Sequence, residues 1–93
     1  MPYKLKLQNE AVLDMRQAFE WYEEQRPGLG TSFLDEVETC FQKLIQSPEL
    51  FGYINKWLRR MKVNGFPYVV IYEIENDLIF VTSVFHTSKA PKH

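Results

Sequence analysis

Hydrophobic and polar positions alternate at the start of this chain and then change to a longer period. Over residues 2–8 the apolar Tyr3, Leu5 and Leu7 alternate with polar residues, which is typical of a strand with one buried face. Over the next two segments, apolar residues recur three and four positions apart, as in an amphipathic helix. The pattern therefore predicts one strand followed by two helices.

The first predicted helix has Asn9 as its N-cap and runs to about Gln25, where Pro27-Gly28 stops it. We expect Trp21 to help hold this helix against the next one, together with a neighbouring residue of the apolar stripe. That stripe consists of Val12, Met15, Phe19 and Tyr22, with Tyr22 as this neighbour.

The second predicted helix opens at Gly30-Thr31-Ser32 and ends at Ser47-Pro48. Ser32 and Asp35 have the spacing of a capping box. The predicted helices are joined by only a few residues, between about Gln25 and Gly30. Helices with so short a connection should form an antiparallel hairpin whose apolar stripes face one sheet. The second stripe consists of Phe33, Val37, Cys40, Phe41 and Leu44. The single cysteine cannot form an internal disulfide, so we interpret it as a small core residue, with a reactive thiol as the alternative.

Three further strands are predicted over residues 57–63, 68–74 and 78–85. Asn64-Gly65 is a strong hairpin signal, and Asn76-Asp77 forms the second turn. The order is therefore β-α-α-β-β-β within one domain, residues 1–93. We expect the α+β class, with an N-terminal helical hairpin packed on one face of a mainly antiparallel four-stranded sheet.

The last two predicted strands are apolar on both faces, although one helical hairpin can cover only one face. On the third strand Tyr68, Val70, Tyr72 and Ile74 lie opposite Val69 and Ile71. On the fourth strand Leu78, Phe80 and Val84 lie opposite Ile79, Val81 and Phe85. The second face therefore either binds a partner or is covered by residues 55–57 and the C-terminal tail.

Charge and composition narrow the function of this 93-residue chain. Residues 1–52 carry five basic and nine acidic side chains, whereas residues 53–93 carry six and three. The small excess of basic side chains in residues 53–93 permits a contact with a small anion. It is too small for a surface that binds nucleic acid over a large area. No apolar run approaches the roughly 20 residues of a membrane span, and Met1-Pro2-Tyr3-Lys4 lacks the apolar run typical of a secretory signal. We expect a cytoplasmic protein without membrane contact, metal or cofactor.

Arg59 and Arg60 are adjacent on one predicted strand, so their side chains point to opposite faces of the sheet. One of them could clamp an anion or carboxylate on the open face, while the other pairs with a helix acid such as Glu20 or Glu24. A solvated or structural ion pair is the alternative interpretation for either arginine.

His86 follows the last strand and is either a general base or a structural histidine that bonds the turn to Pro91. Tyr68 and Tyr72 share one face of a strand, where core packing is the simpler interpretation. Phe85 belongs to the apolar surface of the last strand.

Several short motifs together resemble a known family. They are Ala18-x-x-Trp21-Tyr22-Glu23, Pro27-Gly28-Leu29-Gly30 followed by Phe33, Ser47-Pro48, Leu58-Arg59-Arg60, Phe66-Pro67-Tyr68 with Tyr72, and His86 with Pro91. In this order and topology the chain resembles the RelE/ParE superfamily of bacterial toxins, the stable half of type II toxin–antitoxin pairs. The resemblance covers nearly the whole chain and is specific for the ParE-like branch.

The resemblance implies one of two activities. RelE-like nucleases cleave mRNA on the ribosome, using basic residues that orient the phosphate and a general acid or base. Lys62 matches the second-strand lysine of that pattern, but Val69 and Thr87 stand where arginines are expected. No tyrosine follows Tyr72. We therefore expect a binding toxin rather than an enzyme.

ParE-like members are associated with plasmid stabilisation and with poisoning DNA gyrase, which needs binding but no catalytic group. The resemblance implies a gyrase inhibitor neutralised by a cognate antitoxin, as a homodimer or as a heterotetramer with it. The candidate binding residues are Arg59, Arg60, Tyr68, Tyr72, Phe85 and His86. Two alternatives stay open: a nuclease using Arg59, Arg60, Lys62 and His86, and a non-toxic orphan of the family.

Overall fold

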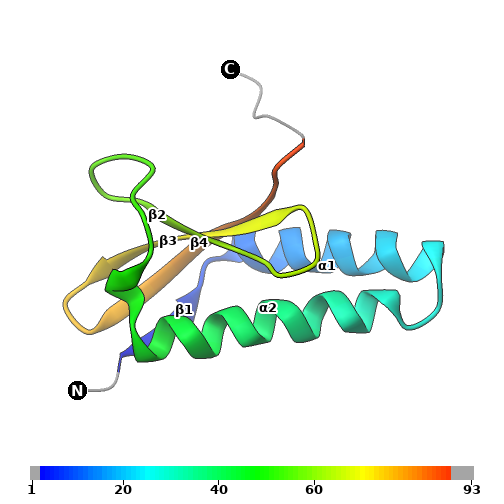
Figure 1. Ribbon diagram of the computed structural model, residues 1–93, viewed down its shortest axis with the longest axis horizontal. Coiled ribbons are helices and arrows are strands. Elements are labelled where there is room, and N and C mark those ends of the chain that lie inside the picture. Colours follow the sequence, from blue (N-terminus) through cyan, green and yellow to red (C-terminus); the bar gives the residue numbers. More distant parts are fainter. Residues whose placement is uncertain (1–2, 89–93) are drawn as a thin grey trace.

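The computed structural model describes residues 3–88, which form two helices lying against one sheet (Figure 1). The elements are β1 (Lys4–Leu7), α1 (Asn9–Gln25), α2 (Leu29–Gln46), the 3-10 turn η1 (Pro48–Leu50), β2 (Arg59–Lys62), β3 (Tyr68–Glu75) and β4 (Leu78–His86). The predicted α+β class and the β-α-α-β-β-β order are confirmed.

The four strands form one sheet in the order β1-β4-β3-β2. Strands β2, β3 and β4 pair antiparallel, whereas β1 pairs parallel to β4, so the sheet is mainly antiparallel as predicted. Helix α1 packs against β4, and the buried side of α2 completes the core on the same face. The other face of the sheet carries no helix among the described residues (Figure 1).

A bulge at Thr82 changes which residues of β4 face the helices. Ile71 pairs with Ser83 and Tyr72 pairs with Val81, so Thr82 has no partner across the ladder. Its Oγ1 donates to the Ile71 carbonyl at 3.2 Å. The extra residue places Val84 on the same buried face as Val81, three positions earlier. The prediction that strict alternation puts them on opposite faces was wrong.

Helix α1 begins at Asn9, with Gln8 rather than Asn9 at the N-cap position and no side-chain bond capping the helix. Its buried residues are Ala11 and Ala18, while Val12 is 40% exposed. The predicted stripe therefore included one residue outside the buried face. Short alanine side chains let the helix backbone lie close to the sheet, and a search for large apolar residues overlooks them.

The start of helix α2 is capped from the other helix. Gly28 takes a left-handed conformation with φ of 89° at the N-cap, and the Glu23 carboxylate of α1 accepts the N–H groups of Gly28 and Gly30 at 2.9 Å each. These are two of the amide groups that a helix N-terminus leaves unpaired. The predicted capping box was wrong, because the Ser32 hydroxyl donates to the Gly28 carbonyl instead.

The two helices touch at their connected ends. A Cβ placed on Gly30 would lie 2.6 Å from the Phe19 carbonyl oxygen, so only glycine permits this approach. Tyr22 stacks on Phe33 across the helix pair, with ring centroids 5.5 Å apart. Trp21 contacts the edge of Tyr22 but is 56% exposed, so Tyr22 alone fills the predicted role between the helices.

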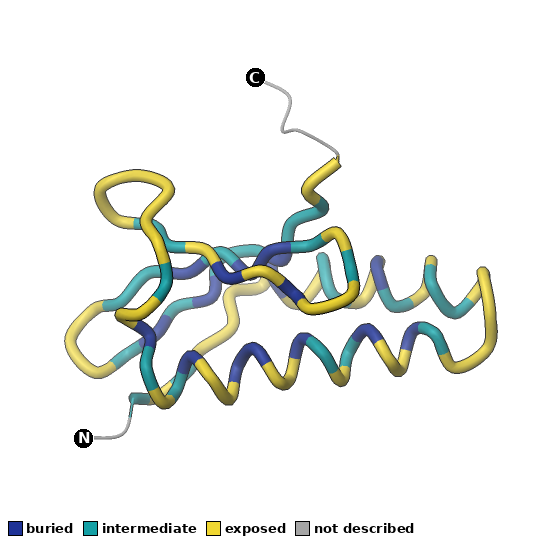
Figure 2. The backbone as a smooth tube through the Cα atoms, viewed as in Figure 1, coloured by how far each residue is buried: buried dark blue, intermediate teal, exposed yellow. Residues whose placement is uncertain are grey.

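The core lies between α2 and the helix side of the sheet. Figure 2 shows the buried positions of α2 recurring along the side nearest the sheet. The predicted stripe of this helix is confirmed, since Phe33, Val37, Cys40, Phe41 and Leu44 are all buried. Burial raises the pKa of the Cys40 thiol, whose Sγ lies 3.5 Å from the Lys62 carbonyl oxygen. A buried thiol that is harder to ionise fits a core residue rather than a nucleophile.

Strand β2 is shorter than the predicted 57–63, because the residues before it form a loop. The Asn55 side chain accepts the N–H groups of Trp57 and Leu58, which bends the chain away from an extended conformation. Tyr53 makes an isolated bridge with Arg59, where the regular strand begins.

Candidate functional site

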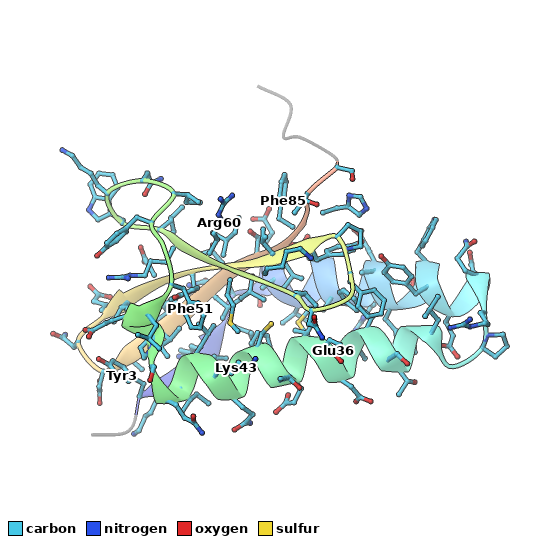
Figure 3. The ribbon with its side chains drawn as sticks, viewed as in Figure 1. Tyr3, Glu36, Lys43, Phe51, Arg60 and Phe85 are labelled. Atoms are coloured by element: carbon cyan, nitrogen blue, oxygen red, sulfur yellow. The ribbon has the colours of Figure 1, made fainter. Side chains whose placement is uncertain are left out.

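The face of the sheet turned away from the helices contains an apolar hollow of about 430 Å³. We call it the open-face hollow; its lining residues are Ile54, Arg60, Val69, Ile71, Phe85 and Thr87. Figure 3 shows Arg60 and Phe85 on the side of the sheet away from α2. Val69 and Phe85 pair across β3 and β4, and Arg60 pairs with Ile71 across β2 and β3.

The two-sided apolar pattern of β3 creates this hollow. Alternation sends Val70 and Tyr72 toward the helices, which leaves Val69 and Ile71 on the opposite face. Ile54 from the loop before β2 borders the hollow, whereas residues 55–57, which were predicted to cover this face, do not line it. The C-terminal tail, the other predicted cover, lies mostly outside the described residues. Arg60 is exposed at the rim and brings a positive charge to an otherwise apolar surface.

Arg59 is held by the chain around it. Its Nη1 donates to the carbonyls of Glu49 and Phe51 at 3.0 and 2.8 Å, and its Nη2 donates to the Tyr53 hydroxyl at 2.8 Å. The guanidinium carbon also lies 3.9 Å from the centre of the Tyr53 ring. Arg59 therefore supports the segment after η1 and has little capacity left to bind an anion.

The predicted pairing of one arginine with Glu20 or Glu24 was wrong for Arg59. The sheet order explains this result, because β2 is an edge strand two positions from β4, against which α1 packs. An acid on α1 is therefore far from Arg59, whereas the carbonyls after α2 are close.

Lys62 and His86 are each engaged locally. The Lys62 Nζ donates to the carbonyls of Val63 and Phe66 and so closes the turn between β2 and β3. The His86 Nδ1 accepts the N–H of Ser88 at 3.1 Å, and its ring meets Tyr68 edge-on at 4.9 Å. The predicted contact of His86 with Pro91 lies outside the described residues.

The four nuclease candidates do not converge on one point. Arg59 pairs with Tyr72 and His86 pairs with Tyr68, so they lie opposite positions of β3 that are about 13 Å apart along the strand. Arg60 extends from the other face, and Lys62 is bonded to the turn.

The two candidate tyrosines of β3 differ in accessibility. Tyr72 is 0% exposed and donates its hydroxyl to the Pro48 carbonyl at 2.7 Å. Burial raises the pKa of Tyr72 to about 12, with the Arg59 charge opposing the shift. No partner can reach Tyr72 while the domain is folded. Tyr68 is half-buried, packs on Phe33, and lines a second cavity.

The second cavity, of about 560 Å³, lies between α1 and β4. The Asp14 carboxylate at its wall accepts the Val84 N–H at 3.0 Å. Desolvation raises the pKa of Asp14, aided by the charge of Glu10 and opposed by the bond from Val84. The contact between Asp14 and Val84 was not predicted from the sequence, although an acid between Ala11 and Ala18 on a buried helix face was a signal for it.

Metal and membrane signatures are absent from the part of the chain that the structure describes. Among residues 3–88, no three His, Cys, Asp or Glu side chains gather closely enough to hold a metal ion. No helix within these residues has the length and apolar character needed to cross a membrane.

The arrangement of an antiparallel helical hairpin on one face of a four-stranded mixed sheet is shared with a solved structure. The structure superposes on a chain described as "Chromosomal ParDE TA system from P. aeruginosa", with a TM-score of 0.80 and 12% sequence identity. The match covers 90% of this chain and 95% of that one. At this identity the likeness establishes a shared fold.

The sequence itself identifies the family. Residues 5–91 match a protein-family model, which is described as "ParE toxin of type II toxin-antitoxin system, parDE". The chain therefore belongs to the ParE toxin family, as the resemblance predicted. Comparison with curated proteins gave no significant match.

Proposed function

We propose that this chain is a toxin that inhibits DNA gyrase by binding and is neutralised by a cognate antitoxin. The observation that carries the proposal is the ParE family match over residues 5–91, almost the full length of the chain. A target-binding toxin needs an accessible complementary surface and no catalytic group, so it requires no constellation of acid, base and phosphate ligands.

The placement of the basic residues favours binding over RNA cleavage. Transition-state stabilisation in phosphoryl chemistry requires several groups within hydrogen-bonding distance of one reacting phosphate. Arg59 and Lys62 instead bond to carbonyls of their own chain, and His86 lies against Tyr68. A nuclease would have to rearrange the fold to assemble these residues.

The open-face hollow is the surface we assign to the antitoxin. Its apolar floor of Val69, Ile71 and Phe85 suits the side chains of a short segment, and Arg60 at the rim suits a carboxylate. The structural relative is described as a ParDE TA system, which supports an antitoxin partner for this chain as well.

The test combines purified components with expression in bacteria. We expect the wild-type chain to stop supercoiling by DNA gyrase, and induced expression to arrest growth with DNA damage and intact mRNA. His86→Ala should behave like the wild type, because binding does not need this imidazole as a base.

Two results would contradict the proposal. If the wild type cleaves mRNA and His86→Ala does not, the nuclease is favoured. If the wild type neither arrests growth nor inhibits gyrase, the non-toxic orphan is favoured. Arg60→Ala should retain gyrase inhibition but weaken neutralisation by the antitoxin, which separates the two binding surfaces.

A further inference from the structure

One loop carries an unusual share of the exposed apolar surface. Of the eight large hydrophobic residues exposed within residues 3–88, four lie in residues 50–58, which we call the aromatic loop. They are Leu50, Tyr53, Ile54 and Trp57. Trp57 is 68% exposed, and the loop stands clear of the sheet on the side away from α2 (Figures 1 and 2). Exposed apolar groups gathered in this way usually mark a contact surface.

Hydrogen bonds hold the tip of the aromatic loop in one shape. The Asn55 Oδ1 accepts the N–H groups of Trp57 and Leu58, both at 2.8 Å. The Ile54 N–H donates to the Leu58 carbonyl at 2.8 Å, which closes the tip. Trp57 thus projects from a turn that is already formed.

Arg59 holds the base of the same loop. Its guanidinium bonds to the carbonyls of Glu49 and Phe51 and lies over the Tyr53 ring, so both sides of the loop are tied to one side chain. The Arg60 N–H adds a bond to the Gly52 carbonyl at 3.1 Å. A loop that is ordered before binding loses less conformational entropy when a partner docks.

From this arrangement we propose that the aromatic loop is the element that docks into an apolar pocket of the folded target protein, with Trp57 as the anchor. Tryptophan and tyrosine are the residues that most often dominate binding energy at protein interfaces. The inference rests on the proposed function, because it assigns the target-binding side of the same toxin.

The shape and charge of the loop favour a folded protein over other partners. A protruding loop offers neither the groove nor the free strand edge that an extended peptide needs. Lys56 lies beside Glu49 and Glu73 around Trp57, and the Arg59 charge is used internally. Mixed charge of this kind does not suit a nucleic-acid backbone or an anionic membrane.

The aromatic loop, which we assign to target binding, is separate from the open-face hollow, which we assign to the antitoxin. Ile54 alone of the four exposed residues lines that hollow, whereas Tyr53 and Trp57 border a different depression with Lys56. An antitoxin seated in the hollow would lie next to the aromatic loop and block it sterically.

The test uses Trp57→Ala, with Trp21→Ala as the matched control. Trp21 is a similarly exposed tryptophan on α1, 56% against 68%, so both variants lose the same side chain from a solvated position. Gyrase supercoiling is titrated with each purified chain, and growth arrest is scored on induction. We expect Trp57→Ala to need roughly tenfold or more protein for half-inhibition, and Trp21→Ala to match the wild type. Equal thermal midpoints would show that both variants fold.

The outcomes separate this inference from the proposed function. Wild-type inhibition that Trp57→Ala retains would overturn the docking role while leaving gyrase as the target. If the wild type spares gyrase but arrests growth, and only Trp57→Ala abolishes the arrest, the docking role stands with another target. A wild type without either activity overturns both. A wild-type dimer in sedimentation that Trp57→Ala dissociates would assign the loop to a second copy of this chain.

Discussion

Neighbouring residues of one strand have different environments, and the two arginines of β2 show this most clearly. Arg59 bonds to three oxygen atoms of the chain and supports the aromatic loop, whereas Arg60 stands at the rim of the open-face hollow. The alternation of a strand predicts their opposite directions. It does not predict which of the two meets carbonyl groups, because these arrive from η1 and the loop after it.

The Tyr72 hydroxyl contributes to stability through one buried hydrogen bond. This hydroxyl satisfies the Pro48 carbonyl, so Tyr72→Phe should lower the free energy of unfolding at neutral pH by about 1–2 kcal/mol. The measurement is chemical denaturation of both chains. Tyr53→Phe is the control, because its hydroxyl is exposed and water can replace the lost bond with Arg59.

Tyr72 should also make the free energy of unfolding depend on pH. Its pKa is raised from 10.0 to about 12 in the folded chain, so the folded state holds the proton more tightly than the unfolded state. Its stabilising effect is complete below pH 10 and is lost as the pH rises from 10 to 12. Tyr72→Phe should therefore lose less stability over that range than the wild type. Equal losses would contradict this account.

At the scale of elements, the contact between α1 and α2 depends on one glycine. Gly30 lies against the Phe19 carbonyl, and a Cβ at 2.6 Å from this oxygen would overlap backbone that cannot move independently of the helix. The Glu23 carboxylate, 2.8 Å from the same position, would also have to move and would strain the cap of α2.

Gly30→Ala should therefore destabilise the domain by about 1–3 kcal/mol, as other overpacking substitutions do. Thermal and urea denaturation would measure the change. Gly52→Ala is the matched control, because a Cβ at Gly52 meets no atom within 4 Å. Helix propensity alone favours alanine over glycine inside α2, so a stabilised Gly30→Ala variant would disprove the close approach.

At the scale of the whole molecule, the strands differ in how they are held. β3 and β4 each pair on both sides, whereas β1 and β2 are the edges of the sheet. The helical hairpin covers only one face, so protection of the other face depends on the short loop around Ile54 and on any bound partner.

Hydrogen exchange should show the same difference between the central strands and the edge strands. We expect the amides of Val70, Tyr72 and Val81 to exchange roughly tenfold or more slowly than those of the β1 and β2 edges, because local opening frees edge strands first. Native-state exchange measured by NMR would test this. Uniform protection across the four strands would mean that the sheet opens only by global unfolding.

Local pattern was enough to predict the order of elements, the stripe of α2, the two-sided character of β3 and the resemblance to the family. These features depend on residue types at short spacings, which are visible along the chain. Tertiary contacts settled the rest: the bulge at Thr82, the cap that Glu23 supplies to α2, the role of Arg59 and the contact of Asp14 with Val84. Each of these joins residues from different elements, and their meeting depends on how the helices and strands pack rather than on local sequence.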